Sequence, residues 1–259
     1  MNDSVVLVEK QDGIATVTLN RPDKLNALNK ELRSAFCVAM QQLRDDGEVR
    51  VIIITGAGRA FCVGLDLKEL GTGKSGIRED NNVTFISVIE DMPLPVIAAV
   101  NGFAITGGFE IVLACDIVLA AEEAQFADTH ARVGVMPGGG MSARLPRAVG
   151  IRKAKEMSLT GNYLGAREAE RMGLVNRVVA KDHLMAAARE LAAQIGGADQ
   201  QIVRNMKRLY ERTTKAALGD ALQIEQEVFR DFNRKADLSQ FEGRRDTVMN
   251  RGRSQASKN

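Results

Sequence analysis

Residues 95–110 read PVIAAVNGFAITGGFE and contain the pattern on which the fold depends. Residues 96–100 are a short, continuous apolar run, which is typical of a strand covered on both faces. A glycine-rich turn follows, and the apolar residues after Gly107 predict a helix that continues to about Ala114. The stretch therefore predicts a buried strand, a tight turn and a helix that begins with two glycines.

The same order occurs earlier in the chain. Residues 51–55 (VIIIT) predict another buried strand, and residues 56–67 (GAGRAFCVGLDL) form a second glycine-rich loop before a helix. Unpaired N–H groups at a helix start, together with the helix dipole, favour negative charge, and glycine lets a ligand approach the backbone closely. A dinucleotide fingerprint fails because Phe61 occupies its third glycine position, and no GxxxxGK[ST] loop is present. The spacing alone thus predicts two anion-holding turns without naming a chemistry.

Similar patterns predict the remaining elements. Residues 5–9 and 14–19 indicate a hairpin, and the apolar stripe from Leu28 to Leu43 predicts a helix capped by Asn29. We further expect a helix near residues 83–89, strands at 117–120 and 174–179, a mobile loop at 71–81, and mainly charged helices after Asp182. These elements predict one α/β domain over residues 1–259, with a core at about 1–195 and a helical part at about 196–259.

Composition excludes several classes of protein. The 259 residues are 45% hydrophobic and 26% charged, with a net charge of +2, which argues against nucleic-acid binding. Three scattered cysteines indicate a reducing compartment, and two histidines make a His-based zinc site improbable. There is no signal-peptide pattern and no apolar run of the ~18 residues that a membrane span needs. We therefore expect a soluble cytoplasmic protein.

Several motifs, in order, give the chain a family resemblance. They are NRP at 20–22, NAL at 26–28, AFCVGLDL at 60–67, residues 95–110, ACD at 114–116, AQF at 124–126, LPRAVG at 145–150, LTG at 159–161 and GLVN at 173–176. In this order they resemble the enoyl-CoA hydratase/isomerase (crotonase) superfamily. The resemblance covers most of the chain and is far more specific than one glycine pattern.

The resemblance carries expectations for the whole molecule. It implies an α/β spiral of repeated ββα units, with C-terminal helices used in a homotrimer or a dimer of trimers; solvated helices of a monomer are the alternative. It also implies an acyl-CoA thioester substrate and fatty-acid β-oxidation as the pathway. No metal or other cofactor is implied, because CoA arrives as part of the substrate.

By the same resemblance, the backbone N–H groups of Leu65 and Gly107 form an oxyanion hole for the thioester oxygen. The alternative is that the glycines beside them only make tight turns. The residues expected to bind CoA or substrate are Lys24, Leu25, Asp66, Leu67, Lys68, Gly108 and Gly138. Lys24 is instead a solvated charge if it meets no CoA phosphate, and Phe241 and Arg244 are expected to close the CoA site of a neighbouring subunit.

The catalytic positions depart from the usual hydratase pattern. Glu110 occupies the position of the family's first catalytic glutamate, but His130 stands at the position of the second. Asp128 either orients His130 or is a turn residue. Gly138 stands where some relatives have an aspartate, which argues against a dehalogenase-like or dienoyl-isomerase-like mechanism; here it gives room for the acyl chain or makes a turn.

Three interpretations of His130 remain open. It replaces the second glutamate as acid or base, because its ordinary pKa of ~6.5 allows either role near neutrality. Alternatively, the protein performs other enolate chemistry, such as double-bond isomerisation or decarboxylation. Third, His130 only packs or contacts the ligand, which leaves a slow enzyme or a non-catalytic acyl-CoA binding protein. We favour hydration of a 2-enoyl-CoA, with Glu110 and His130 as the catalytic side chains.

Overall fold

The chain divides into two compact units, residues 1–204 and 205–259. The computed structural model describes residues 4–72, 84–235, 245, 248–251 and 253. The boundary expected near residue 195 stays a prediction. The two compact units divide at a later point, inside α10 (Gln200–Thr213). The expected loop at 71–81 falls mostly outside the described residues, and Gly71 ends a short helix.

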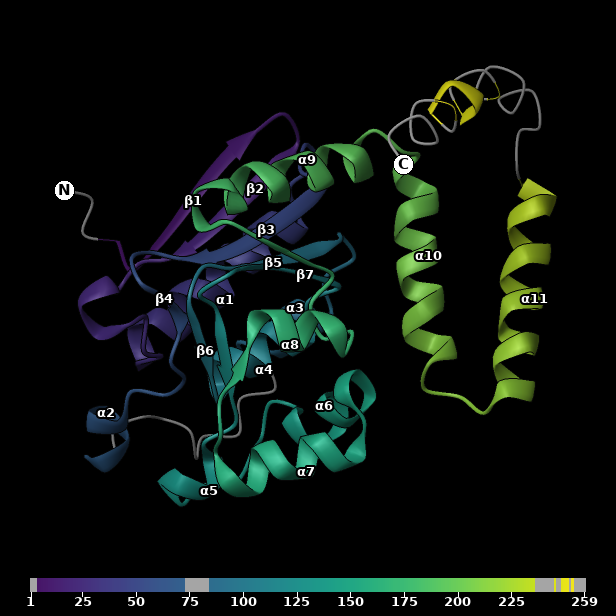
Figure 1. Ribbon diagram of the computed structural model, residues 1–259. Coiled ribbons are helices and arrows are strands. Elements are labelled where there is room, and N and C mark those ends of the chain that lie inside the picture. The colour runs from purple at the N-terminus through teal and green to yellow at the C-terminus, as the bar shows by residue number, and fades with distance from the viewer. Residues whose placement is uncertain (1–3, 73–83, 236–244, 246–247, 252, 254–259) are drawn as a thin grey trace. The chain divides into compact units, whose positions relative to one another are not determined.

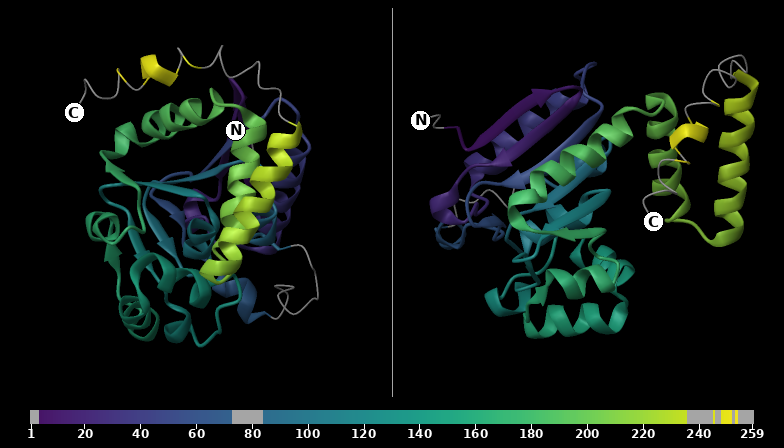
Figure 2. Two further views of the ribbon diagram at one scale, coloured as in Figure 1. Left: turned by 90° about the vertical axis from the view of Figure 1, so that its right-hand side faces the viewer. Right: turned by 45° about the horizontal axis from the view of Figure 1, so that its top comes forward.

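A six-stranded sheet organises the first unit, in the order β1-β2-β3-β5-β7-β10 (Figure 1). Only the β1–β2 hairpin is antiparallel; each later pair in this sheet is parallel. The strands are β1 (Val6–Gln11), β2 (Ile14–Leu19), β3 (Val51–Gly56), β5 (Val96–Val100), β7 (Ile117–Ala121) and β10 (Arg177–Val179). Strand β1 of this hairpin forms one edge of the sheet, as the right-hand view of Figure 2 shows.

A second, four-stranded sheet has the order β4-β6-β8-β9. Its strands are β4 (Ala60–Cys62), β6 (Phe103–Ile105), β8 (Gln125–Ala127) and β9 (Leu164–Gly165). β3, β5 and β7 of the large sheet are each followed by one strand of the small sheet and then by a helix. This gives three successive ββα units, as the resemblance implies.

Helices cover both sheets. After the 3-10 turn η1 (Pro22–Lys24), the helices of the first half are α1 (Lys30–Arg44), α2 (Leu67–Gly71), α3 (Ser87–Glu90), α4 (Gly107–Ala114) and α5 (His130–Val133). They are followed by α6 (Met141–Val149), α7 (Ile151–Thr160), α8 (Ala166–Arg171), η2 (Lys181–His183) and α9 (Leu184–Gly196). Among the described residues, no helix combines the length and apolar character needed to cross a bilayer.

The central strands β3 and β5 are buried on both faces, as their continuous apolar sequences predict. On β3, Val51 and Ile53 pack toward α9, whereas Ile52 and Ile54 pack into the main core on the opposite face. Figure 1 shows α9 lying along the first of these faces. Because both faces are covered, the C-terminal ends of β3 and β5 are held in place. The two glycine-rich loops that follow these strands therefore begin at fixed positions.

Several sequence predictions are confirmed at the level of single residues. Asn29 caps α1, where its side chain accepts a hydrogen bond of 2.9 Å from the Leu32 N–H. The helix expected at Gly107–Ala114 has those bounds.

Three details differ from expectation. Each glycine-rich loop contains a short strand of the small sheet, which the sequence reading treated as turn. The helix expected near 83–89 is the single turn α3, with Val83 outside the described residues, and the strand expected at 174–179 is confined to Arg177–Val179.

The second unit holds most of α10 and the helix α11 (Leu218–Lys235). The charged side chains of α10 are mainly basic, and α11 carries both signs, which agrees with the charged helices expected after Asp182. Residues 241 and 244, expected to contact a neighbouring subunit, lie outside the described residues.

Asn26 joins the segment before α1 to the first glycine-rich loop. Its side chain is fully buried, and its amide donates to the carbonyl oxygens of Ala57, Ala60 and Phe61 at 3.0, 2.8 and 3.1 Å. Its side-chain oxygen accepts a hydrogen bond of 2.8 Å from the Arg21 N–H. Removing a buried group with this many bonds leaves several backbone atoms without partners.

We expect Asn26→Ala to lower the free energy of unfolding by about 3 kcal/mol, because buried carbonyl groups lose their donor. Urea denaturation of both proteins measures the change. Asn20→Ala is the matched control: the Asn20 amide donates one exposed bond of 2.9 Å to the Ser4 carbonyl, and we expect a loss below about 1 kcal/mol. Equal losses in the two variants would contradict the assignment.

Candidate active site

The first loop places the backbone of Leu65 beside Leu28. The two residues form an isolated parallel bridge, in which the Leu28 N–H donates to the Gly64 carbonyl at 2.8 Å and the Asp66 N–H donates to the Leu28 carbonyl at 3.2 Å. A parallel bridge of this kind does not use the N–H of its central residue. Within the described part of the chain, the Leu65 N–H has no hydrogen-bond acceptor.

The second loop brings the Gly107 amide to the same place. A Cβ on Gly64 would lie 3.0 Å from the Gly107 nitrogen, and a Cβ on Gly107 would lie 3.8 Å from the Leu65 nitrogen. Gly107 is the first residue of α4, so its N–H has no acceptor inside the helix, and none of the described residues outside the helix accepts from it. Two backbone donors thus lie close together without a partner in the protein.

Gly64 is required for this approach. Its φ of +87° is in the left-handed region, and a side chain there would press on the Gly107 nitrogen, the Ile105 carbonyl at 3.0 Å and the Thr106 side chain. Gly108, whose expected contact with substrate stays a prediction, also has a structural role. A Cβ on Gly108 would lie 2.0 Å from the Cys62 carbonyl oxygen, so this glycine lets α4 pack against the end of β4.

Glu110 lies in the first turn of α4, one helical turn after Gly107. The residue is 4% exposed, and its Oε1 accepts hydrogen bonds from the N–H groups of Gly139 at 2.8 Å and Met141 at 3.3 Å. Burial raises the pKa of the Glu110 carboxyl above its ordinary value, and these bonds and the charge of His130 offset only part of that effect. The carboxyl is therefore a stronger base than a solvated glutamate.

His130 begins α5 and is also buried. Its Nδ1 lies 2.6 Å from Oδ1 of Asp128, and the same oxygen accepts from the His130 backbone N–H at 3.2 Å. Burial opposes ionisation of Asp128, but its hydrogen bonds with His130 and Ser158 outweigh that effect and lower the pKa of the carboxyl. Asp128 therefore orients the ring of His130, which is one of the two interpretations that its position in the sequence allowed.

A charged pair holds the glycine loop at residues 138–140, and the sequence reading missed it. The Arg144 guanidinium donates to the Gly139 carbonyl at 2.8 Å and forms an ion pair with Glu90 of α3. A Cβ on Gly139 would lie 2.7 Å from the Glu110 carboxyl, so the loop backbone approaches Glu110 only because this residue is glycine. Gly138 itself is exposed and makes no such contact.

The expected CoA-binding residues gather around the first loop. The Val63 N–H donates to the Leu25 carbonyl at 3.3 Å, which places the 24–25 segment beside that loop. Lys24 and Lys68 are exposed, and Leu67 is 57% exposed. These side chains are accessible from solvent, and their contact with CoA stays a prediction.

Asp66 serves the loop itself. Its side chain accepts from the Arg21 guanidinium and caps α2 through the Lys68 N–H, each at 3.2 Å. Partial burial opposes ionisation, but the hydrogen bonds from Arg21 and from the start of α2 lower the pKa of Asp66. The Asp66 carboxylate is thus paired with the Arg21 guanidinium, and it stabilises the fold of the first loop.

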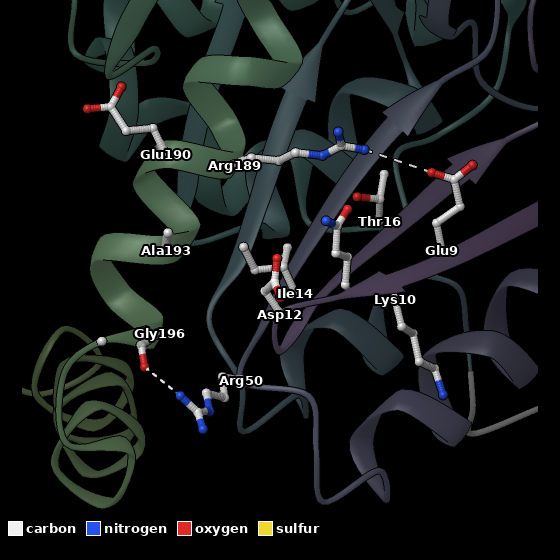
Figure 3. A pocket seen from close by; sticks show the side chains of 12 residues that line it. Glu9, Lys10, Asp12, Ile14, Thr16, Arg50, Arg189, Glu190, Ala193 and Gly196 are labelled. Carbon is white, nitrogen blue, oxygen red and sulfur yellow. Dashed lines mark hydrogen bonds and ion pairs between the residues drawn. The ribbon is translucent and has the colours of Figure 1, made fainter.

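A cavity of about 670 Å³ lies elsewhere, between the β1–β2 hairpin and the end of α9 (Figure 3). Its charged side chains are mixed in sign and partly paired: Arg189 lies 3.8 Å from Glu9, and Arg50 donates to the Gly196 carbonyl at 3.3 Å. None of the expected site residues lines it. No three His, Cys, Asp or Glu side chains among the described residues gather as metal ligands would. The candidate active site is therefore at the two amides.

Known proteins share this architecture along the whole chain. The family model described as enoyl-CoA hydratase/isomerase matches residues 9–250. This chain belongs to that family. A probable peroxisomal enoyl-CoA hydratase of Arabidopsis thaliana is 37% identical over 258 residues, which cover 99% of this chain and 97% of the relative. A short-chain-enoyl-CoA hydratase of Clostridium acetobutylicum is 38% identical over 231 residues, covering 86% and 87% of the two chains.

Solved structures give the same family. An enoyl-CoA hydratase from Mycobacterium smegmatis superposes with a TM-score of 0.74 and 48% identity, covering 90% of this chain and 99% of that chain. An enoyl-CoA hydratase from Bacillus anthracis superposes with a TM-score of 0.85 and 32% identity, covering 95% and 96%. The family resemblance and the crotonase-type α/β fold expected from the sequence are confirmed. The family description includes hydratases and isomerases, so membership alone does not choose between them.

We expect Asp128→Asn to lower the free energy of unfolding at neutral pH by about 1–3 kcal/mol, because a buried charged hydrogen bond to His130 is weakened. The pKa of Asp128 is lowered in the folded state, so its contribution is present above the ordinary aspartate pKa and is lost as the pH falls through the folded value. Urea unfolding of both proteins across this pH range measures the difference.

The difference between the parent and Asp128→Asn should therefore shrink in acid. Asp23→Asn, at an exposed position in η1, is the control and should change the unfolding free energy little at any pH. A loss in Asp128→Asn that stays constant from neutral to acid pH would show that the ionised carboxyl is not what stabilises this pair.

Proposed function

We propose that this chain hydrates a 2-enoyl-CoA thioester, with the N–H groups of Leu65 and Gly107 as its oxyanion hole. The observation that carries the proposal is the close approach of these two unpartnered amides, one helical turn from the buried Glu110. Water attack on the β-carbon of the substrate moves an electron pair to the thioester oxygen. Two preorganised donors stabilise that negative charge, and each is typically worth about 10²–10³ in rate.

Glu110 is proposed as the base that takes a proton from the attacking water. Its raised pKa increases its proton affinity, while the hydrogen bonds from Gly139 and Met141 keep the carboxylate in one orientation. The water oxygen then bonds to the β-carbon as the carbon–carbon π bond breaks and the enolate forms. One proton has moved from water to Glu110, and the negative charge lies on the thioester oxygen.

His130 is proposed to complete the addition by giving a proton to the α-carbon of the enolate. Oδ1 of Asp128 lies 2.6 Å from Nδ1 and orients the ring, so Nε2 is proposed as the donor. The enolate collapses to the thioester as the new C–H bond forms. Glu110 leaves this half-reaction protonated and His130 neutral, and proton exchange with solvent returns both to their starting states.

Isomerisation of a 3-enoyl-CoA is a second candidate, favoured by the unequal catalytic pair. A single carboxylate suffices to take a proton from the α-carbon and return it to the γ-carbon through the same enolate. Glu110 is a buried carboxylate beside the two donors, whereas a histidine occupies the second position. In this reaction His130 would only bind or pack. Assembly into a homotrimer or a dimer of trimers stays a prediction.

We expect Glu110→Gln to lower kcat for hydration of crotonyl-CoA by about 10²–10⁴-fold, because the amide is not a base. His130→Ala should cause a loss of the same order. Loss of absorbance of the conjugated thioester measures the rate, and Glu31→Gln, at an exposed position in α1, is the control. If neither Glu110→Gln nor His130→Ala has a lower kcat than the parent, the acid/base assignment is wrong. If the parent converts only a 3-enoyl-CoA, isomerisation replaces hydration as the function.

The pH dependence of kcat/KM should show the raised pKa of Glu110. As the pH falls, Glu110 is protonated and the base is lost, so kcat/KM decreases on the acid side. Because burial raises this pKa, the midpoint should lie above the ordinary glutamate value of ~4.3. The residual activity of Glu110→Gln should lack this acid limb. An acid limb that persists unchanged in Glu110→Gln would assign it to another group.

A further inference from the structure

Two threonines connect the second and third ββα units at the site. The hydroxyl oxygens of Thr106, before α4, and Thr129, before α5, lie 2.5 Å apart. The Thr129 backbone N–H also donates to the Thr106 hydroxyl oxygen at 3.2 Å. Thr106 is 7% exposed and Thr129 is half-buried, so these hydrogen bonds are partly shielded from water. Neither residue belongs to the acid/base or oxyanion assignments above.

Thr106 has a backbone conformation that its side chain disfavours. Its φ of 53° and ψ of −111° are unusual for a β-branched residue and cost conformational energy. Backbone hydrogen bonds stabilise this conformation. The Thr106 N–H donates to the Ala127 carbonyl at 2.9 Å, and the Thr106 carbonyl accepts from the Glu110 N–H at 2.9 Å. Together with the Thr129 contacts, each of its hydrogen-bonding heavy atoms has a partner.

This conformation determines where the next amide lies. The peptide bond after Thr106 contains the Gly107 N–H, and that peptide turns with the ψ of Thr106. The Thr106 Cβ also lies 3.2 Å from the position that a Cβ on Gly64 would take, so its side chain packs against the turn that carries the Leu65 N–H. Thr106 therefore contacts the turn that carries the Leu65 N–H, and it directly precedes Gly107, whose N–H is the second donor.

Thr129 has the corresponding position in the third unit. It directly precedes His130, and its contacts with Thr106 fix the start of α5 against the start of α4. We propose that Thr106 and Thr129 are positioning residues, whose paired hydroxyls hold the Gly107 N–H in place relative to Leu65 and His130. This inference rests on the proposed oxyanion role of Leu65 and Gly107.

Removing either hydroxyl should affect the chemical step more than substrate binding. We expect Thr106→Val and Thr129→Val each to lower kcat for crotonyl-CoA by about 10-fold or more with KM little changed, because small displacements of preorganised groups are costly. The double variant should be no slower than the slower single one, since both remove the same contact. Thr106→Ser, which keeps the hydroxyl, should recover most of the rate.

Thr55→Val is the matched control. Thr55 is also 7% exposed, and its hydroxyl donates to the Ala99 carbonyl at 2.8 Å, but it lies in β3 away from the two amides. It should lose stability without a selective loss of kcat. Additive losses in the Thr106/Thr129 double variant, or a change in KM alone, would overturn the positioning role.

A second measurement separates this inference from the proposed function. Acetoacetyl-CoA has an acidic α-proton, and its enolate absorbs in the ultraviolet, so the bound enolate fraction reports the oxyanion hole without turnover. We expect the parent and Thr55→Val to raise the enolate fraction, and Thr106→Val to raise it at least about 10-fold less. An equal increase in Thr106→Val would overturn the positioning role alone. No increase in the parent would overturn the oxyanion hole and the positioning role together.

Discussion

The close approach of two backbone segments at Gly64 and Gly107 is the constraint on which the candidate site depends. It brings the Leu65 and Gly107 amides together, and it is possible only because Gly64 has no side chain and a positive φ. Large parts of the fold maintain this approach. β3 and β5 are neighbours in a sheet buried on both faces, and Asn26 ties the first loop to the segment before α1.

The two side chains proposed as catalytic, Glu110 and His130, lie in different electrostatic surroundings. The Glu110 carboxylate is buried and accepts hydrogen bonds from two backbone N–H groups. Burial destabilises the charged form more than these bonds stabilise it, so the pKa of Glu110 rises. His130 is held by Asp128, whose pKa is lowered and which therefore supplies a fixed negative charge beside the ring. The two side chains are thus held differently: Glu110 by backbone N–H groups of the 139–141 segment, and His130 by the Asp128 carboxylate.

The local elements of the fold were predictable because each depends on a short pattern. The buried strands at 51–55 and 96–100, the Asn29 cap and the helix from Gly107 to Ala114 follow from residue type and spacing alone. The short strands β4 and β6 were not predicted, since three residues carry too little periodicity and their pairing is decided by partners far along the chain. Glu110 and His130 came from family motifs, and the structure adds their burial and partners.

Other contacts at the site left no signal in the sequence. Arg144 with Glu90 and Thr106 with Thr129 join positions 54 and 23 residues apart, and no local pattern marks such pairs. The role of Gly108 was also outside sequence reasoning, because the constraint comes from the Cys62 carbonyl of another unit.

The three ββα units contribute to the site one after another at their strand-to-helix junctions. The first junction supplies the Leu65 amide, the second supplies Gly107 and Glu110, and the third supplies His130. Both amides of the proposed oxyanion hole thus come from the first two units, whereas His130 comes from the third. A different residue at the start of α5 could therefore alter the proposed proton transfer while both amides keep their positions.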